Sequence, residues 1–168
     1  FFLAIILTYL VRWVALKLKI VDEPTEPRKI HKKPMPLLGG FAIFLSFFGV
    51  LAYYVFFTDK VLGTEIFAKN LVGVFLGGAL LMIGGFLDDK YKLAPKYQII
   101  WPIAAVIAVI VSGVGISQIT NPFGGLLHLD SWQKILFWWN GIPYKITIFA
   151  DLFTFVWLMG MMYTTKFL

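Results

Sequence analysis

The chain has 168 residues, of which 60% are hydrophobic and only 14% are charged, whereas a soluble domain has roughly 45–50% apolar and about 25% charged residues. Its apolar residues fall into long uncharged runs, which argues against a water-soluble fold. The absence of cysteine removes disulfides, thiolate metal sites and cysteine nucleophiles. We therefore expect an integral membrane protein and, because the chain begins and ends inside apolar runs, a piece that is incomplete at both ends.

Five apolar segments are each close to the ~20 residues that a helix needs to cross the hydrocarbon layer. They cover about residues 1–16, 37–57, 70–87, 97–116 and 146–168. Nothing in them alternates with a period of two, so strands are a poor alternative to helices. The predicted fold is an all-α polytopic membrane protein that forms a single membrane domain over residues 1–168.

The first connection, over residues 21–36, carries four prolines and five groups that are cationic or can become so. The prolines keep it extended and stiff. Arg28, Lys29, His31 and Lys33 could bind phosphate groups, since arginine binds phosphate oxygens bidentately, lysine acts as a point charge and histidine exchanges a proton near neutral pH. The alternative is an ordinary basic loop that touches anionic lipid.

Glycines recur at the entry to the second span and along the third. Gly73 and Gly77 have the spacing of closely packed membrane helices. Gly39-Gly40 would either let the backbone approach a phosphate or serve packing or a bend.

Asp88 and Asp89 end the third span. Helix carbonyls already concentrate negative charge there, so a cation would relieve the pair. Carboxylates that bind Mg²⁺ beside substrate phosphates are common in phosphoryl chemistry. Neighbours on a helix point about 100° apart, so one aspartate would face the ion while the other orients or deprotonates a second reactant. The alternative is a polar stop at the membrane boundary.

Residues 117–145 differ from the rest in character. They contain the turn signal Asn121-Pro122-Phe123-Gly124-Gly125, followed by Trp132, Trp138, Trp139 and Tyr144. This aromatic density is typical of a membrane interface. We expect a short extracytoplasmic hairpin followed by a helix on the membrane surface.

The basic residues favour one orientation. If the first connection faces the cytoplasm, eleven of the fifteen Lys and Arg residues lie on that side, and basic loops resist translocation. Lys166, near the end of the fifth span, would be on the same side as Asp88 and Asp89 and would either reach the interface or add charge to a shared site. We expect a multi-pass protein of the cytoplasmic membrane with its active face in the cytoplasm, and no nucleic-acid partner.

Three motifs in this order resemble the polyprenyl-phosphate N-acetylhexosamine-1-phosphate transferases. They are Asp22-x-Pro24, Arg28-Lys29-x-His31-x-x-Pro34-x-Pro36-x-x-Gly39-Gly40 and Gly85-Phe86-Leu87-Asp88-Asp89-Lys90. The first loop looks more like the branch that uses UDP-N-acetylglucosamine than like the related phospho-N-acetylmuramoyl-pentapeptide translocase of peptidoglycan synthesis, which is the alternative.

The resemblance implies transfer of a sugar 1-phosphate, most simply N-acetylglucosamine 1-phosphate, from a UDP-sugar to polyprenyl phosphate. It implies Mg²⁺ as cofactor, with Mn²⁺ as a substitute, and Asp88 and Asp89 as catalytic and metal-binding residues. Arg28, Lys29, His31 and Lys33 match a basic loop expected near phosphate-bearing substrates. Lys166 stands where the family has an asparagine, and it would either put a fixed charge against a diphosphate or mark a subgroup with a changed substrate preference. Such an enzyme would catalyse the first membrane step of cell-envelope glycan synthesis, and a homodimer is compatible with it.

The sequence departs from the family at its end. The family usually has an Asn-x-x-Asn-Leu-x-Asp-Gly run after the fifth span, whereas this chain reads Tyr163-Thr164-Thr165-Lys166-Phe167-Leu168. We expect the polypeptide as given to be inactive. A non-enzymatic transport or scaffold component is the other function class, but it would place ionisable groups near the middle of its spans.

Overall fold

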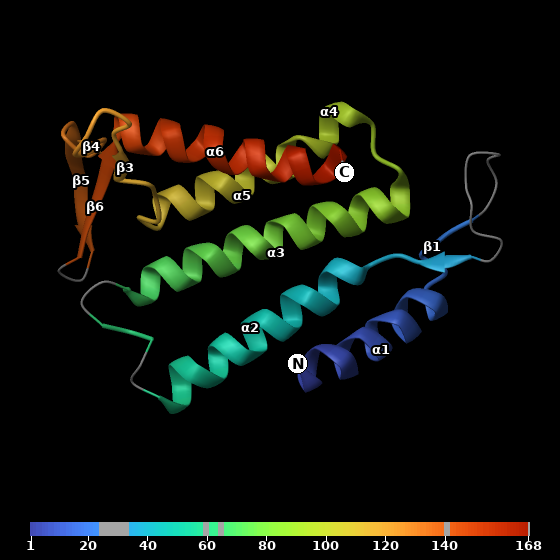
Figure 1. The fold of residues 1–168 in the computed structure, drawn as a ribbon. Helices are drawn as coiled ribbons and strands as arrows, with labels where there is room; N and C mark the ends of the chain where they lie inside the picture. The colour runs from blue at the N-terminus through green and yellow to red at the C-terminus, as the bar shows by residue number, and fades with distance from the viewer. Residues whose placement is uncertain (24–33, 59–60, 64–65, 140–141, 168) are drawn as a thin grey trace. The chain divides into compact units, whose positions relative to one another are not determined.

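The computed structural model describes residues 1–168 with the exception of 24–33, 59–60, 64–65, 140–141 and 168 (Figure 1). The chain divides into two compact units, and each is described here by itself. The first comprises Phe1–Gly63 and Leu81–Gln98, and the second comprises Thr64–Leu80 and Ile99–Leu168. Helix α3 (Ala68–Tyr91) contributes its first part to the second unit and its last part to the first unit.

The first unit is built on the helices α1 (Phe2–Lys17) and α2 (Gly39–Phe57). They pack closely, because a Cβ atom on Gly49 would lie 3.3 Å from the side chain of Leu3. The two-residue strands β1 (Val21–Asp22) and β2 (Met35–Pro36) pair antiparallel between these helices in the chain. The short helix α4 (Pro95–Gln98) follows the end of α3.

A small apolar core holds this unit together. Its buried members are Val11, Ala15, Ile20, Leu38 and Ala42, and the partly buried residues Leu7, Leu37, Phe41 and Phe86 pack against them. The rings of Phe41 and Phe86 meet edge to face with centroids 6.3 Å apart. This core therefore fixes the start of α2 beside the last turns of α3, where the aspartate pair lies.

In the second unit the first part of α3 packs against α5 (Ile100–Val111). A Cβ atom on Gly73 would collide with the side chain of Ser112. On Gly77 it would lie 2.8 Å from Cγ2 of Val109 and 3.0 Å from the carbonyl oxygen of Ala105. The prediction that these glycines serve close packing is confirmed.

Helix α6 (Ile148–Phe167) is tied to the segment that follows α5 by a buried hydroxyl. Oγ1 of Thr154 accepts a hydrogen bond of 2.8 Å from the backbone amide of Ile116 and donates one of 2.7 Å to the carbonyl of Ala150. The face of α6 that carries Ala150 and Thr154 is therefore the face turned into this unit.

Two hairpins lie between α5 and α6. The strands β3 (Gln118–Thr120) and β4 (Leu126–His128) pair on either side of the predicted turn, where Gly124 and Gly125 have φ angles of +106° and +84°. The short hairpin is thus confirmed.

The expected surface helix is wrong. Residues 133–139 and 142–147 form the strands β5 (Gln133–Trp139) and β6 (Ile142–Thr147), which pair antiparallel. The sequence is rich in the aromatic and β-branched residues that favour strands, and Asn-Gly at positions 140–141 is a strong hairpin signal in sequence.

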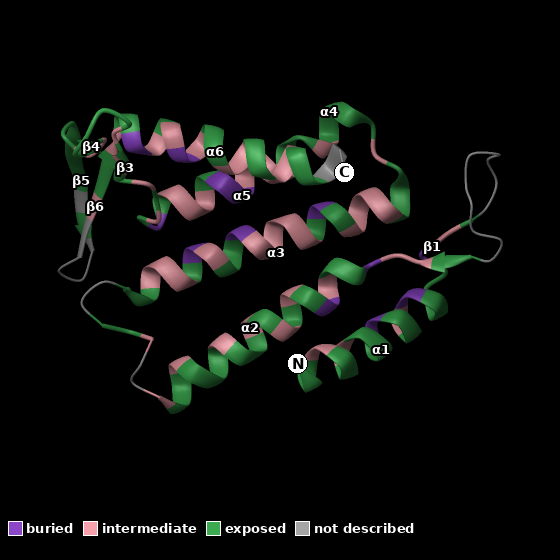
Figure 2. Cartoon of the chain, in the orientation of Figure 1, coloured by how far each residue is buried: buried purple, intermediate pink, exposed green. Residues whose placement is uncertain are grey.

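The membrane helices agree with the predicted all-α fold. The helices α2, α3 and α6 are long and apolar enough to cross a membrane, whereas α1 and the apolar stretch Pro95–Val111 are shorter. Figure 2 shows exposed or partly exposed residues over most of the helix surfaces, as expected of helices that meet lipid. All five predicted spans contain helix, and the described residues add six short strands.

The close approach at Gly77 can be tested by substitution. Gly77→Ala should lower the thermal unfolding midpoint of the full-length protein in detergent, because overpacking a tight contact costs about 1–3 kcal/mol. Gly85→Ala is the matched control on the same helix, since no atom lies within 4 Å of a Cβ there. Alanine favours helix by up to about 1 kcal/mol relative to glycine, so the control should be neutral or stabilising. Equal midpoints for the two variants would contradict the packing assignment.

Candidate functional site

A polar cavity of about 390 Å³ lies within the first unit. Four of the side chains that line it are carboxylates. Its lining consists of Val21, Asp22, Glu23, Leu37, Asp88, Asp89, Lys92, Leu93 and Gln98. Strand β1 supplies the first acidic pair and the end of α3 supplies the second, so acidic residues far apart in the sequence share one cavity.

The carboxylate of Asp88 is held by its own neighbourhood in the chain. Its Oδ1 atom accepts a hydrogen bond of 2.8 Å from Nε2 of Gln98 and one of 3.1 Å from the backbone amide of Leu93. Nε2 of Gln98 also donates to the carbonyl of Leu93 at 2.9 Å. Because Oδ1 has two donors, Oδ2 is the oxygen that Asp88 can offer to a ligand in the cavity.

Asp89 is held by a different element. The backbone amide of Leu38 donates a hydrogen bond to its carboxylate. Leu38 is buried and sits directly before α2 with a φ angle of +71°, a conformation that a branched side chain rarely adopts. The core around Leu38 therefore stabilises a strained backbone that turns its amide toward Asp89.

Backbone strain is concentrated in this unit. Across the residues that the structure describes, positive φ angles at non-glycine positions occur at Lys19, Leu38 and Lys92, with values of 56°, 71° and 50°. Leu38 contacts Asp89 and Lys92 lines the cavity. Such strain costs of order 1–3 kcal/mol per residue and clusters at functional sites. The cavity is accordingly the strongest candidate site in the described part of the chain.

Only some of the predicted site residues are found in this cavity. The structure brings Asp88 and Asp89 together there. Arg28, Lys29, His31 and Lys33 lie outside the described residues, and Lys166 lies in the last turn of α6 with a side chain that is not described. Their roles remain predictions.

Four polar lining residues are not among the predicted site residues: Asp22, Glu23, Lys92 and Gln98. The motif Asp22-x-Pro24 is the sequence signal for the first of them. The other three depend on how β1 and the segment after α3 fold back toward the cavity.

The donor set suits a hard divalent cation only in part. Among the described residues, no three His, Asp or Glu side chains converge closely enough to hold a metal ion by themselves. Mg²⁺, however, usually takes one or two carboxylates and completes its shell with water and substrate phosphates. Oδ2 of Asp88 and the carboxylate of Asp89 fit that pattern.

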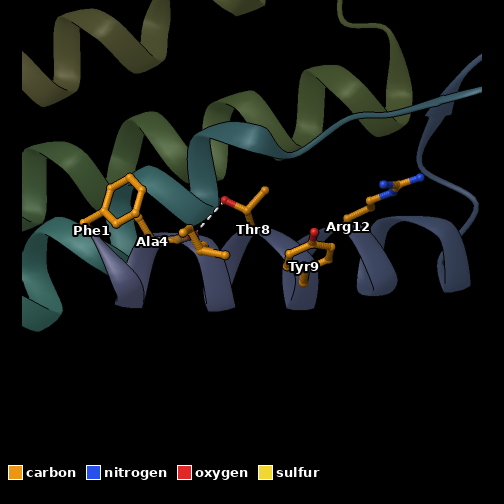
Figure 3. Close-up of a pocket in the computed structure, with 6 residues that line it drawn as sticks. Phe1, Ala4, Thr8, Tyr9 and Arg12 are labelled. Atoms are coloured by element: carbon orange, nitrogen blue, oxygen red, sulfur yellow. Dashed lines mark hydrogen bonds between the residues drawn. The ribbon is translucent and has the colours of Figure 1, made fainter.

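A second hollow, of about 360 Å³, follows one face of α1 (Figure 3). It is lined by Phe1, Ala4, Ile5, Thr8, Tyr9 and Arg12. The hydroxyl of Thr8 donates to the carbonyl of Ala4 at 2.7 Å and is thus satisfied within the helix. This hollow has no carboxylate and none of the predicted site residues, so the polar cavity remains the candidate.

Comparison with known proteins assigns the family. The family model described as glycosyl transferase family 4 matches residues 71–165, which include the aspartate pair. The chain belongs to this family. No solved structure matches the chain.

Individual relatives agree with this membership of glycosyl transferase family 4. A Bacillus subtilis protein named as a probable undecaprenyl-phosphate N-acetylglucosaminyl 1-phosphate transferase is 32% identical over 71% of this chain and 30% of its own length. A decaprenyl-phosphate N-acetylglucosaminephosphotransferase of Mycobacterium tuberculosis is 30% identical over 79% of this chain and 34% of its own length. The chain thus spans about a third of the length of these relatives.

The hydrogen bonds of Gln98 predict a positioning role in this family 4 protein. Gln98→Leu removes one of the two donors to Asp88 and should lower kcat of the full-length protein about 10–100-fold, the usual effect of losing a partner that orients a ligating residue. The KM for either substrate should change little.

Gln118→Leu, at an exposed position in β3, is the control and should leave kcat unchanged. A Gln98→Leu protein that unfolds more easily but turns over normally per folded molecule would show that Gln98 is structural only.

Proposed function

We propose that the full-length protein transfers N-acetylglucosamine 1-phosphate from a UDP-sugar to a polyprenyl phosphate, releasing UMP. The observation that carries the proposal is the Asp88–Asp89 pair on a polar cavity at the end of an apolar helix. The sugar and the class of lipid in this proposal are those in the names of the relatives. Family membership supports this reading over a transport or scaffold role.

The reaction joins a lipid in the membrane to a nucleotide in water. An oxygen of the lipid phosphate forms a bond to the phosphorus that carries the sugar, and the bond from that phosphorus to the UMP oxygen breaks. Both reactants are anionic, so their approach requires positive charge at the boundary of the hydrocarbon layer. A polar cavity at the end of a span lies at the membrane boundary, where both the lipid phosphate and the nucleotide could bind.

The charge of the cavity supports a metal ion. Among the described lining residues, Asp22, Glu23 and the aspartate pair face one ammonium, that of Lys92. Carboxylates near phosphate groups repel them, and the repulsion is strong where water is partly excluded. A divalent cation between the carboxylates and the phosphates would attract both and so reduce this repulsion, which is why Mg²⁺ is the proposed cofactor and Mn²⁺ its substitute.

The aspartates would hold such an ion or act on the lipid phosphate. When bound, Mg²⁺ would neutralise phosphate charge and polarise the reacting phosphoryl group. The protein's own contribution is to fix Asp88 through Gln98 and Leu93 and to fix Asp89 through Leu38. One of the two aspartates would take the proton of the acceptor phosphate while the other orients a reactant or the ion.

The basic residues of the first loop complete the proposal. Arg28, Lys29, His31 and Lys33 would bind substrate phosphates, with Lys166 as a further charge. The strands β1 and β2 flank residues 24–33 in the chain, and β1 itself lines the cavity. The proposed location is the cytoplasmic membrane with the cavity open to the cytoplasm, supported by the distribution of basic residues.

Replacement of the carboxylates tests the site. In the full-length protein Asp88→Asn and Asp89→Asn should each lower UMP release from UDP-N-acetylglucosamine at least about 100-fold, in an assay that contains undecaprenyl phosphate and Mg²⁺. Asp130→Asn, at a half-buried position in the loop after β4 and outside the lining of the candidate cavity, should retain full turnover. Thermal unfolding would show that all three variants are folded.

Normal turnover by both site variants would refute the aspartate assignment. An active wild-type protein that needs no Mg²⁺ would refute the cofactor. A protein that accepts only UDP-N-acetylmuramoyl-pentapeptide would establish the peptidoglycan alternative.

Lys92 allows stability and function to be separated. Lys92→Gly should raise the unfolding free energy by about 1–2 kcal/mol, because it removes the side chain from a left-handed residue. It should also raise the KM for the UDP-sugar, because the cavity loses its lining ammonium. Lys96→Gly, within α4, should lower stability by about 1 kcal/mol and leave KM unchanged. An unchanged KM in Lys92→Gly would remove this lysine from the phosphate site.

A further inference from the structure

The hairpin β5–β6 has one polar and one apolar face. Cross-strand partners share a face, so Gln133 with Thr147 lies opposite to Lys134 with Ile146. Gln133, Lys145 and Thr147 line a polar cavity of about 440 Å³ in the second unit, and Nζ of Lys145 donates to Oε1 of Gln133 at 3.3 Å. The polar face of the hairpin is therefore engaged within the unit.

The other face forms an apolar groove of about 440 Å³. It is lined by Ser131, Trp132, Lys134, Leu136, Ile146 and Ile148, together with Gln133, which also lines the polar cavity. Trp132 and Leu136 are 69% and 57% exposed, which is costly for large apolar side chains in water. Within the described part of the chain no carboxylate pairs with Lys134. The groove thus combines an apolar floor with one positive charge.

The groove continues along α6. The rings of Trp132 and Phe149 meet edge to face at 6.2 Å. Phe149, Phe153, Val156 and Gly160 follow at spacings that place them on one face of a helix. A further hollow of about 300 Å³ is lined there by Phe153, Val156, Trp157, Gly160, Met161 and Thr164, and nothing lies within 4 Å of a Cβ on Gly160.

This face differs from the one that packs within the unit. Phe149, Val156 and Gly160 are exposed, whereas the buried Ala150 and Thr154 lie about 100° further round α6. From Ile148 to Gly160 the helix rises by about 18 Å at 1.5 Å per residue, slightly more than half of a hydrocarbon core that is about 30 Å thick. The apolar track therefore has the depth of one lipid leaflet.

We infer that the hairpin and α6 form a binding site for an anionic phospholipid of the leaflet in which α6 begins. The phosphate lies at Lys134, and one acyl chain runs past Trp132 and along the face of α6 to Gly160. Charge complementarity at Lys134 and continuity with the membrane-facing surface of α6 favour a lipid over a protein partner. The site is independent of the proposed transferase activity.

Lipid retention tests this site. The full-length protein is reconstituted into vesicles of phosphatidylcholine and phosphatidylglycerol at a ratio of about three to one and extracted in mild detergent. Native mass spectrometry then measures how much lipid remains bound. The wild-type protein should retain one phosphatidylglycerol, and Lys134→Glu should retain it at least about fivefold less often, the factor that corresponds to the loss of one basic residue near a membrane. Lys145→Glu is the matched control, because this lysine lies on β6 and lines the polar cavity. Equal retention in both variants would overturn the inference.

A second measurement identifies what covers the groove. A spin label at Leu136→Cys in the same vesicles should be reached by oxygen in the acyl region and not by a water-soluble nickel complex, and a label at Lys145→Cys should show the reverse. Shielding of Leu136 from both reagents would mean that another segment of the chain covers the groove. A dimer that dissociates on Trp132→Glu would mean that a second copy does. Either result would overturn the lipid site.

Discussion

Repulsion between carboxylates is the constraint on which the first unit depends. Four acidic side chains line one cavity at the end of an apolar helix, a place where helix carbonyls add further negative charge. The fold tolerates this because backbone amides and one side-chain amide donate to Asp88 and Asp89. These donors fix the aspartates without neutralising them, so the remaining negative charge is available to attract a cation.

The apolar core serves this polar site directly. Leu38 is buried among Val11, Ala15, Ile20 and Ala42, so its side chain is fixed by packing between α1 and the start of α2. This packing holds the left-handed backbone at Leu38, which costs of order 1–3 kcal/mol and turns its amide toward Asp89. Packing between α1 and α2 thus determines how a carboxylate on α3 is oriented.

The sequence was informative where a pattern is local. Long apolar runs predicted the helices, the Gly73 and Gly77 spacing predicted close packing, and Asn121-Pro122 with the following glycines predicted the first hairpin. The second hairpin was missed because the tryptophans were interpreted as a surface helix, although Asn-Gly follows them in the sequence.

The candidate site could be predicted only in part for a related reason. The two aspartates are adjacent in the sequence and can be recognised there as a pair. Asp22, by contrast, lies at the cavity because β1 pairs with β2, and Gln98 because the segment after α3 folds back. Lys92 resembled any basic residue of a cytoplasmic loop. The left-handed backbone of Lys92 arises only in the folded chain, and no residue pattern in the sequence predicts it.

The two aspartates are held over very different distances along the chain. Asp88 is bound by Leu93 and Gln98, which follow within the same short segment, whereas Asp89 is bound by Leu38 on the far side of α2. Contacts between near neighbours form quickly and at low entropic cost, and distant ones form late. We therefore expect the contacts of Asp88 to form earlier in folding than the contact of Asp89 with Leu38. A substitution that displaces Leu38 should change the orientation of Asp89 and leave that of Asp88 unchanged.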